Sequence, residues 1–504
     1  MIQKITHSIL SRYYRPVKKF IEDPLGTQQR TLDYLLRHGR NTIYGNEHGF
    51  HSIRNSSDFA KIPVISYEEL RPWLDRIIKH QQQDVLWDTP VRWFAMSSGT
   101  TEDKSKYIPV TRESLYNGNY RAGYHMLGIY AHHHPDTAFI LGKTLVLGGS
   151  QQVNRIGGDI YTGDISAILM KNLPVVAKRS RTPESIALIP DWEEKLQKLV
   201  DYAMHADIRA MVGVPSWVLV LLKKIVEERG ITILELWPRL EVFFHGGVSF
   251  LPFQEQYEKL IPSAKMCYWE TYNASEGFFG VQYAPTSKDM LLLLDNEVYY
   301  EFIPVNEWDK DNPVAVPLCE VEVGVQYAVV ISTSGGLWRY RIGDTIQFSS
   351  TLPYLFKITG RTKQFINAFG EELIVENADK AIDEACRLTG AKVTEYTAAP
   401  VYFGDFRNGA HEWLIEFEMM PDSGDLDEFA HILDEILKRL NSDYEAKRSY
   451  NLSLNMPIIR AMEKDTFYNW LKSRGRIGGQ NKVPKLSNNR KYVDSIMEFA
   501  ASKS

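Results

Sequence analysis

Four short motifs along the chain combine hydroxyl, glycine, carboxylate and basic residues in patterns suited to holding a nucleotide. The first is the stretch SSGTTEDKSKYIP at residues 97–109. Its hydroxyl groups and glycine allow backbone N–H groups to turn toward an anion, and Lys106 adds a point charge suited to a polyphosphate. Taken alone, a polar turn that caps a helix is the simpler interpretation, so this motif needs support from elsewhere in the chain.

Each of the other three motifs offers a different contact to a nucleotide. His245-Gly246-Gly247 could let a flat ring lie against the backbone, because paired glycines lack side chains there. The YNASEG segment combines a stacking Tyr272 with a hydroxyl and with Glu276, whose carboxylate suits Mg²⁺ held together with phosphates. In YRIGD, Asp344 can accept hydrogen bonds from both hydroxyls of a ribose. Each segment alone also fits an ordinary turn.

The elements that must position these motifs alternate between strand and helix. Residues 1–90 are expected to be a mainly helical start, and short β-rich runs then alternate with amphipathic helices, which predicts an α/β core with largely parallel strands. The stretch 298–350 is almost all strand and predicts a β-subdomain. Residues 368–504 are typical of a smaller α+β domain. Ligand sites in open α/β sheets lie outside the carboxyl ends of the strands, so four motifs that follow predicted strands reinforce one another.

Length and composition exclude several classes of protein. With 504 residues the chain is long enough for two or three domains. Its formal charge of −5 is unsuited to holding a nucleic-acid backbone by bulk charge. Cys267, Cys319 and Cys386 are too scattered for a disulfide framework or a zinc site. We find neither a signal-peptide pattern nor a bilayer-length apolar run. We therefore expect a reduced, cytoplasmic protein without nucleic acid or integral membrane contact.

Taken together, the motifs resemble the adenylate-forming enzyme superfamily and, more narrowly, the auxin-responsive Gretchen Hagen family of acyl acid amido synthetases. SSGTTEDKSKYIP resembles the family's phosphate loop, YNASEG its adenine and metal motif, and YRIGD its ribose motif. HGGV, GRTKQFINAFGEEL and the C-terminal GGQNKVPKL also fit. Two departures mark a member unlike the plant proteins. Asp103 stands where a second glycine is usual, and Glu371 or Glu372 stands where plant members often carry a lysine.

The resemblance implies a role for each motif residue. Lys106, Glu276 and Lys482 would be catalytic: Lys106 would neutralise the polyphosphate, Glu276 would bind Mg²⁺, and Lys482 would be presented by a mobile C-terminal domain. The residues expected to bind ATP are Ser97, Ser98, Gly99, Thr100, Thr101, Gly246, Gly247, Tyr272, Asn273, Ala274, Ser275, Asp344 and Arg361. The candidates for contact with the acyl substrate are Tyr124, Val214, Trp217 and His245. Apolar residues at helical spacing are more often core, and His245 fits packing as well as a pocket.

The implied activity is ATP-dependent adenylation of a carboxylic acid to an acyl-AMP with release of pyrophosphate. The acyl group would then pass to the amine of an amino acid and form an amide. Because the small domain rotates between the two half-reactions in this superfamily, residues 1–358 are expected to form the nucleotide- and acyl-binding domain, 359–367 the hinge and 368–504 the lid. Two alternatives stay open: an acyl-CoA ligase that shares the first step, and an inactive nucleotide- or acid-binding protein on the same fold. We expect a monomer or a weak homodimer.

Overall fold

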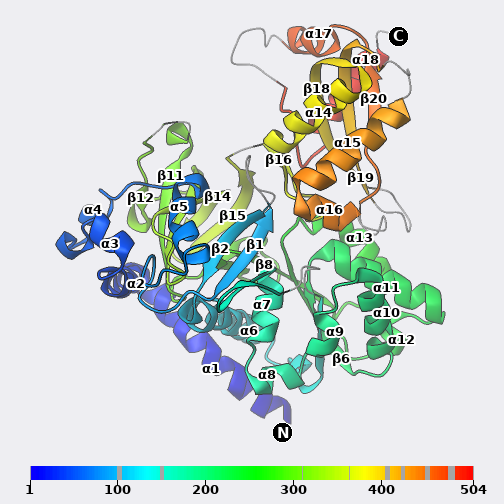
Figure 1. Cartoon of the computed structure of the whole chain (residues 1–504). Coiled ribbons are helices and arrows are strands. Elements are labelled where there is room, and N and C mark those ends of the chain that lie inside the picture. Colours follow the sequence, from blue (N-terminus) through cyan, green and yellow to red (C-terminus); the bar gives the residue numbers. More distant parts are fainter. Residues whose placement is uncertain are drawn as a thin grey trace.

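The computed structural model describes residues 2–98, 105–147, 153–308, 310, 312–362, 364–402, 409–421, 426–448, 454–474 and 483–502. A large N-terminal part, coloured blue to green-yellow in Figure 1, carries the main sheet. A smaller C-terminal part, coloured yellow to red, stands on one end of it. This arrangement is the mixed α/β architecture that the sequence predicts.

The N-terminal segment is helical, as expected, and local cap signals set where its helices begin. Asp23 accepts a hydrogen bond from the Gly26 N–H at the start of the second helix, where Pro24 fits the first turn. Ser66 and Glu69 form a capping box at the start of the fifth helix. The elements are α1 (Ile2–Glu22), α2 (Pro24–Gly39), α3 (Ile43–Glu47), η1 (Phe50–Ser52), α4 (Ser56–Phe59) and α5 (Tyr67–Ile78).

Within the described residues, the largest sheet has 11 strands and combines two kinds of pairing. In spatial order it consists of β12 (Val316–Pro317), β11 (Val298–Pro304), β13 (Gln326–Thr333), β14 (Tyr340–Thr351), β15 (Tyr354–Arg361), β10 (Met290–Leu292), β9 (Gly277–Gln282), β8 (Cys267–Ala274), β7 (Val242–Gly246), β6 (Ile208–Gly213) and β3 (Lys143–Leu147). Strands β3, β6, β7 and β8 pair in parallel, and the rest of the sheet is antiparallel. The β-rich stretch after residue 298 therefore continues the same sheet as the α/β core.

Parallel strands need long crossovers, and helices supply them here. In Figure 1 these helices gather beside the parallel end of the sheet. Residues 114–133 form a π-helical turn followed by an α-helix. The elements of the region are η2 (Ser114–Tyr120), α6 (Arg121–His133), η3 (Phe139–Leu141), α7 (Ile165–Lys171), α8 (Val175–Arg179), α9 (Glu184–Ala187), α10 (Trp192–Ala203), α11 (Pro215–Arg229), α12 (Ile233–Leu236) and α13 (Leu251–Leu260).

A smaller sheet in the N-terminal part has the order β2 (Ser105–Val110), β1 (Trp93–Ser98), β5 (Ile160–Gly163) and β4 (Asn154–Gly157). Strands β1 and β2 are antiparallel, so residues before and after the predicted phosphate loop lie opposite each other. Within the described residues, no helix combines the length and apolar character needed to cross a bilayer.

The C-terminal part begins with the short hairpin of β16 (Phe365–Ile366) and β17 (Leu373–Ile374). Its sheet has the order β18 (Lys392–Val401), β19 (Ala410–Met419) and β20 (Ile458–Met462). The last strand of this sheet begins at Ile458. The helices are α14 (Val375–Thr389), α15 (Leu426–Leu440), α16 (Ser442–Arg448), α17 (Thr466–Ser473) and α18 (Lys491–Ala501).

Two large groups of buried apolar side chains form the core. One lies between the N-terminal helices and the antiparallel part of the main sheet. The other runs from α10, α11 and α13 into the C-terminal part, where it includes Phe369 and Trp413. Phe253 of α13 and Tyr402 meet edge to face with ring centres 5.9 Å apart, and Phe369 lies 5.4 Å from the same tyrosine ring. The apolar core thus continues across the boundary between the two parts.

Candidate functional site

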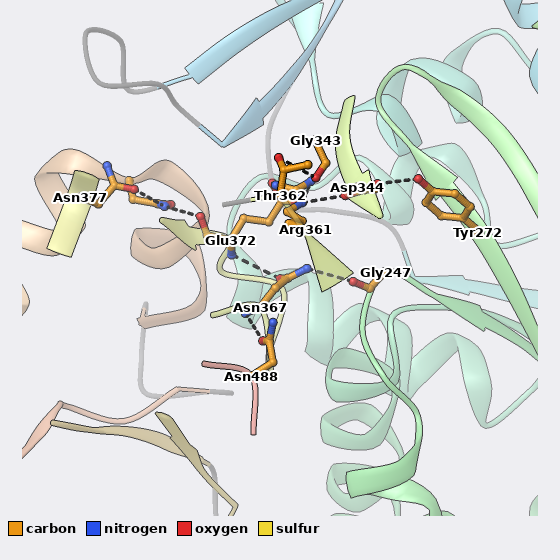
Figure 2. Close-up of polar contacts among 11 residues, drawn as sticks. Gly247, Tyr272, Gly343, Asp344, Arg361, Thr362, Asn367, Glu372, Asn377 and Asn488 are labelled. Carbon is orange, nitrogen blue, oxygen red and sulfur yellow. Dashed lines mark hydrogen bonds and ion pairs between the residues drawn. The ribbon is translucent and has the colours of Figure 1, made fainter. Parts of the chain in front are cut away.

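Asp344, the predicted ribose-binding carboxylate, lies at the centre of a buried hydrogen-bonded group. Arg361 is its register partner across the β14–β15 hairpin, and its Nε donates to Asp344 Oδ1 at 2.7 Å. From β8, the Tyr272 hydroxyl donates to Asp344 Oδ2 at 2.6 Å (Figure 2). Burial and the adjacent Asp344 raise the pKa of Tyr272 well above its usual value, so the phenol keeps its proton. The carboxylate is therefore held in place at both oxygens.

Glu276 lies in the connection between β8 and β9, where Ala274 pairs with Gly277. Burial raises the pKa of Glu276 to about 7, opposed by the positive charge of Lys106 and increased by the negative charge of Asp344. Lys106 comes from β2, directly opposite Ser97 of β1, and its Nζ lies 5.8 Å from the ring centre of Tyr67. The β8–β9 turn and strand β2 therefore bring the predicted metal ligand and the predicted phosphate cation within electrostatic range of each other.

Glycine is required at two successive positions at the end of β7, at Gly246 by the packing of the strands and at Gly247 by the backbone conformation. A Cβ at Gly246 would lie 2.4 Å from the carbonyl oxygen of Thr271, its register partner on β8. Gly247 has φ +84°, a conformation that side chains other than glycine rarely adopt. Val214, at the end of β6, is the neighbour that a Cβ on Gly247 would meet, at 3.5 Å. Gly247 is exposed in this turn, so its face without a side chain suits the approach of a flat ring.

Three motif boundaries differ from those expected. Tyr272, Asn273 and Ala274 belong to β8, and the YNASEG segment is a hairpin turn rather than a loop after the strand. Gly246 is the last residue of β7. Asp344 lies inside β14, near its beginning, rather than at a strand's end. Strand β14 is antiparallel to its neighbours, and the hydrogen bond from Tyr272 to Asp344 nevertheless joins two of the motifs.

The candidates for acyl contact are spread over several elements. Trp217 is buried on α11, with the Lys447 Nζ of α16 4.2 Å from its ring centre. His245 is buried and stacks on Phe250 at 4.3 Å; burial lowers the pKa of its imidazole to about 3, so it stays neutral. Tyr124 is partly exposed and stacks on Tyr13 of α1 at 4.7 Å. Their role in substrate binding stays a prediction.

Several predicted residues lie outside the part of the chain that the structure describes. These are Gly99, Thr100 and Thr101 of the phosphate loop, Asp103 within it, and Lys482 near the C-terminus. Ser97 and Ser98 are the last residues of β1 and lead into that loop. Ser275 precedes Glu276 in the β8–β9 turn, and Asn273 is exposed beside it.

The segment after Arg361 contains contacts that sequence reasoning missed. Arg361 reaches Glu372 with both terminal nitrogens at 3.4 Å, while holding Asp344 (Figure 2). Asn367 donates from Nδ2 to the Gly247 carbonyl at 3.1 Å and accepts the Glu372 N–H at 3.3 Å. Its own N–H donates to Asn488 Oδ1 at 2.6 Å. No local pattern of residues predicts these contacts, because each joins segments that are distant along the chain or depends on a turn.

Comparison with known proteins identifies the family. Residues 14–266 match the GH3 family N-terminal domain, 291–361 its central domain and 376–491 its C-terminal domain. The chain belongs to the GH3 family, and the predicted resemblance is confirmed. An indole-3-acetic acid-amido synthetase of Arabidopsis thaliana, GH3.4, is 26% identical over 93% of this chain and 90% of its own length. The jasmonoyl–L-amino acid synthetase JAR4 of Nicotiana attenuata is 23% identical over 64% of this chain and 66% of its own.

Solved structures of two kinds of ligase have a similar fold. The acyl acid amido synthetase AtGH3.15, in complex with 2,4-DB, matches with a TM-score of 0.60 at 19% identity, covering 98% of this chain and 96% of that chain. The 2-hydroxyisobutyryl-CoA ligase, in complex with 2-HIB-AMP and CoA, matches with a TM-score of 0.56 at 14% identity, covering 96% and 93%. At these identities the likeness establishes the fold and leaves the acceptor open.

Proposed function

We propose that the protein uses ATP to adenylate a carboxylic acid and then transfers the acyl group to the amine of an amino acid. The observation that carries the proposal is the meeting of Tyr272, Asp344 and Arg361 beside Glu276 and Lys106, in a chain of the GH3 family. The amido synthetase activity in the names of its relatives supports the same reaction.

The reaction needs activation because a carboxylate repels nucleophiles. Its oxygen attacks the α-phosphorus of ATP, the bond to pyrophosphate breaks, and the acyl-AMP that forms has AMP as a good leaving group. The amine then attacks the acyl carbon, AMP departs, and the amine loses a proton to give the amide. The protein contributes mainly position and charge: Asp344 would hold the ribose, Lys106 would offset the growing charge on the pyrophosphate, and Gly246 and Gly247 would face the adenine.

The residues present fit Mg²⁺ only as an ion held largely by the substrate. Among the described residues, no cluster of three or more His, Cys, Asp or Glu side chains could hold a metal by itself. Glu276 offers a carboxylate within electrostatic range of Lys106. Magnesium commonly keeps several waters and binds through one or two carboxylates together with substrate phosphates, and there it neutralises phosphate charge. Glu276 would be the protein's ligand to it.

ATP–pyrophosphate exchange tests the first half-reaction without knowledge of the acceptor. The panel contains aromatic, indolic, short aliphatic and fatty acids, and Glu276→Gln is the variant compared. Exchange that depends on one acid and falls sharply in folded Glu276→Gln is the expected result. Absence of exchange with every acid, while ATP still binds, would favour the non-catalytic protein of the same fold.

The acceptor is tested with amino acids and CoA in competition, since a CoA ligase has the same fold. We expect an amide with an amino acid and no thioester. A thioester alone would assign the protein to the ligases that share only the first step. Cytoplasmic location and a monomeric or weakly dimeric state remain part of the proposal.

A further inference from the structure

Two neighbouring glutamates in the turn between β16 and β17 have different surroundings. Glu371 is fully buried, accepts the N–H groups of Ala368 and Phe369, and lies 2.7 Å from His411 Nε2. It therefore stabilises the turn itself. Glu372 turns the other way, toward the nucleotide side, and its carboxylate lies at 3.4 Å from both terminal nitrogens of Arg361. Only Glu372 can act on the site.

The backbone of Glu372 is held in an unusual conformation. Its φ is +40°, which is uncommon for a residue with a side chain and costs free energy unless its surroundings impose it. The surroundings do so here: its N–H donates to Asn367 Oδ1 at 3.3 Å, and its carbonyl accepts from Asn441 Nδ2 at 3.1 Å. Asn367 in turn donates to the Gly247 carbonyl. The C-terminal part thus orients the Glu372 carboxylate toward Arg361. It also attaches the β16–β17 turn to Gly247, one of the two glycines predicted to face the adenine.

Arg361 connects Glu372 to Asp344, the carboxylate predicted to bind the ribose. The guanidinium donates to Asp344 from Nε and faces Glu372 with its other two nitrogens, so its planar fork is fixed from both ends. Burial lowers the pKa of Arg361, but the carboxylates of Glu372 and Asp344 outweigh burial and raise it overall, so the cation is permanent. Removing the Glu372 carboxylate would take away the acceptor of the two terminal nitrogens of Arg361. The guanidinium would then hold Asp344 less rigidly.

We propose that Glu372, acting through Arg361, is a positioning residue that fixes Asp344 on the acyl-adenylate during amide formation. The inference rests on the proposed function. Charge decides which half-reaction it serves, because Asp344 and Glu276 already lie beside Arg361 and a further carboxylate repels a triphosphate. After pyrophosphate has left, the adenylate carries far less negative charge, and the amino acid arrives with an ammonium group that a carboxylate attracts; this group loses a proton to solvent before the free amine attacks. The contact between Glu372 and Arg361 is therefore expected to favour amide formation, the second half-reaction, over adenylation.

The test separates the two half-reactions in full-length protein. ATP–pyrophosphate exchange measures the first, and single-turnover transfer from enzyme-bound acyl-adenylate to the amino acid measures the second. For Glu372→Gln, transfer is expected to slow by about tenfold, the range of a lost charge-assisted contact, while exchange stays within about twofold of wild type. Glu372→Asp should recover part of the transfer rate. Glu435→Gln, an exposed glutamate on α15 paired with Lys438, is the matched control and should change neither rate.

The outcomes are distinguishable. Transfer at the wild-type rate in Glu372→Gln would overturn the inference and leave the proposed function intact. Equal losses in both half-reactions together with a lower melting temperature would also overturn it, because they would indicate a structural role. Absence of exchange in the wild-type protein would instead contradict the proposed function itself.

Discussion

The Tyr272 hydroxyl and the Asp344 carboxylate, 72 positions apart in the chain, meet at 2.6 Å. One comes from a strand of the parallel half of the main sheet and the other from the antiparallel half. Both are buried, so the hydrogen bond forms away from bulk water, where its loss leaves a carboxylate oxygen without its donor.

Tyr272→Phe removes only this donor. We expect the KM for ATP to rise by about three- to tenfold, corresponding to the roughly 1 kcal/mol that a typical intramolecular hydrogen bond contributes. The maximal exchange rate should change less, because the ring still packs. Steady-state exchange kinetics check this, with Tyr468→Phe on the exposed side of α17 as control. An unchanged KM in Tyr272→Phe would show that the pair does not serve nucleotide binding.

Lys106→Ala should lower the rate of adenylation by about 100-fold, the usual cost of losing a group that stabilises charge in the transition state. Lys79→Ala is the control, because Lys79 is an exposed residue at the end of α5 whose ion pair is with Asp75. Circular dichroism confirms folding, and pyrophosphate exchange gives the rates. A rate within a few-fold of wild type would remove Lys106 from the catalytic group.

Glu276 gives the protein a pH dependence of defined sign. Its pKa is raised to about 7, so in the folded protein it is protonated below that pH and ionised above it. If the ionised form binds the cation that accompanies ATP, kcat/KM for ATP should increase from pH 6 to pH 8. In Glu276→Gln this increase should disappear. A flat profile in the wild type would contradict the role.

The raised pKa of Glu276 also affects stability. Because the unfolded state ionises near the ordinary value, the folded state loses stability relative to it as pH rises from there to about 7. Relative to wild type, Glu276→Gln should therefore gain up to about 3 kcal/mol at pH 8.5 and little at pH 5, since each tenfold change in an ionisation constant corresponds to about 1.4 kcal/mol. Denaturant unfolding at both pH values measures the difference. An equal effect at both values would indicate a cause other than ionisation.

Gly246→Ala tests the close contact between β7 and β8. The added Cβ would overlap the Thr271 carbonyl, which is backbone and cannot move aside, so we expect a loss of roughly 2–4 kcal/mol and weaker ATP binding. Gly123→Ala in α6 is the matched control: its Cβ would have no neighbour within 4 Å. Because alanine favours helix, that variant should be unchanged or gain up to about 1 kcal/mol. Equal stability of the two variants would contradict the packing described.

Much of the site could be predicted because its residue types are grouped in short motifs. In the structure, hydrogen bonds to Asp344 bring together Tyr272 and Arg361, which the sequence had assigned to the same predicted nucleotide site. What failed were the exact boundaries: Asp344 lies inside the long strand β14, near its beginning, rather than after the end of a strand. Periodicity does not reveal at which residue a strand begins or ends.

The contacts of Glu372 and Asn367 could not be predicted. The sequence offers two adjacent glutamates with no difference between them, and only the backbone turn at φ +40° separates the buried one from the one that faces Arg361. Likewise, the bond from Asn367 to Gly247 joins positions 120 apart, and no local pattern encodes it. The residues that contact the acyl substrate could not be predicted for the same reason. An aromatic residue at helical spacing gives the same sequence pattern whether it lines a pocket or packs in a core.

The core that continues from α11 and α13 into the C-terminal part has a thermodynamic consequence. Phe369, Tyr402 and Phe253 pack across the boundary, so the rotation that the sequence analysis predicts for the C-terminal part would have to separate or exchange apolar surfaces. Exposure of apolar surface to water raises heat capacity. A turnover step limited by that rotation would therefore show a curved temperature dependence, and the curvature would measure how much of this core opens in each cycle.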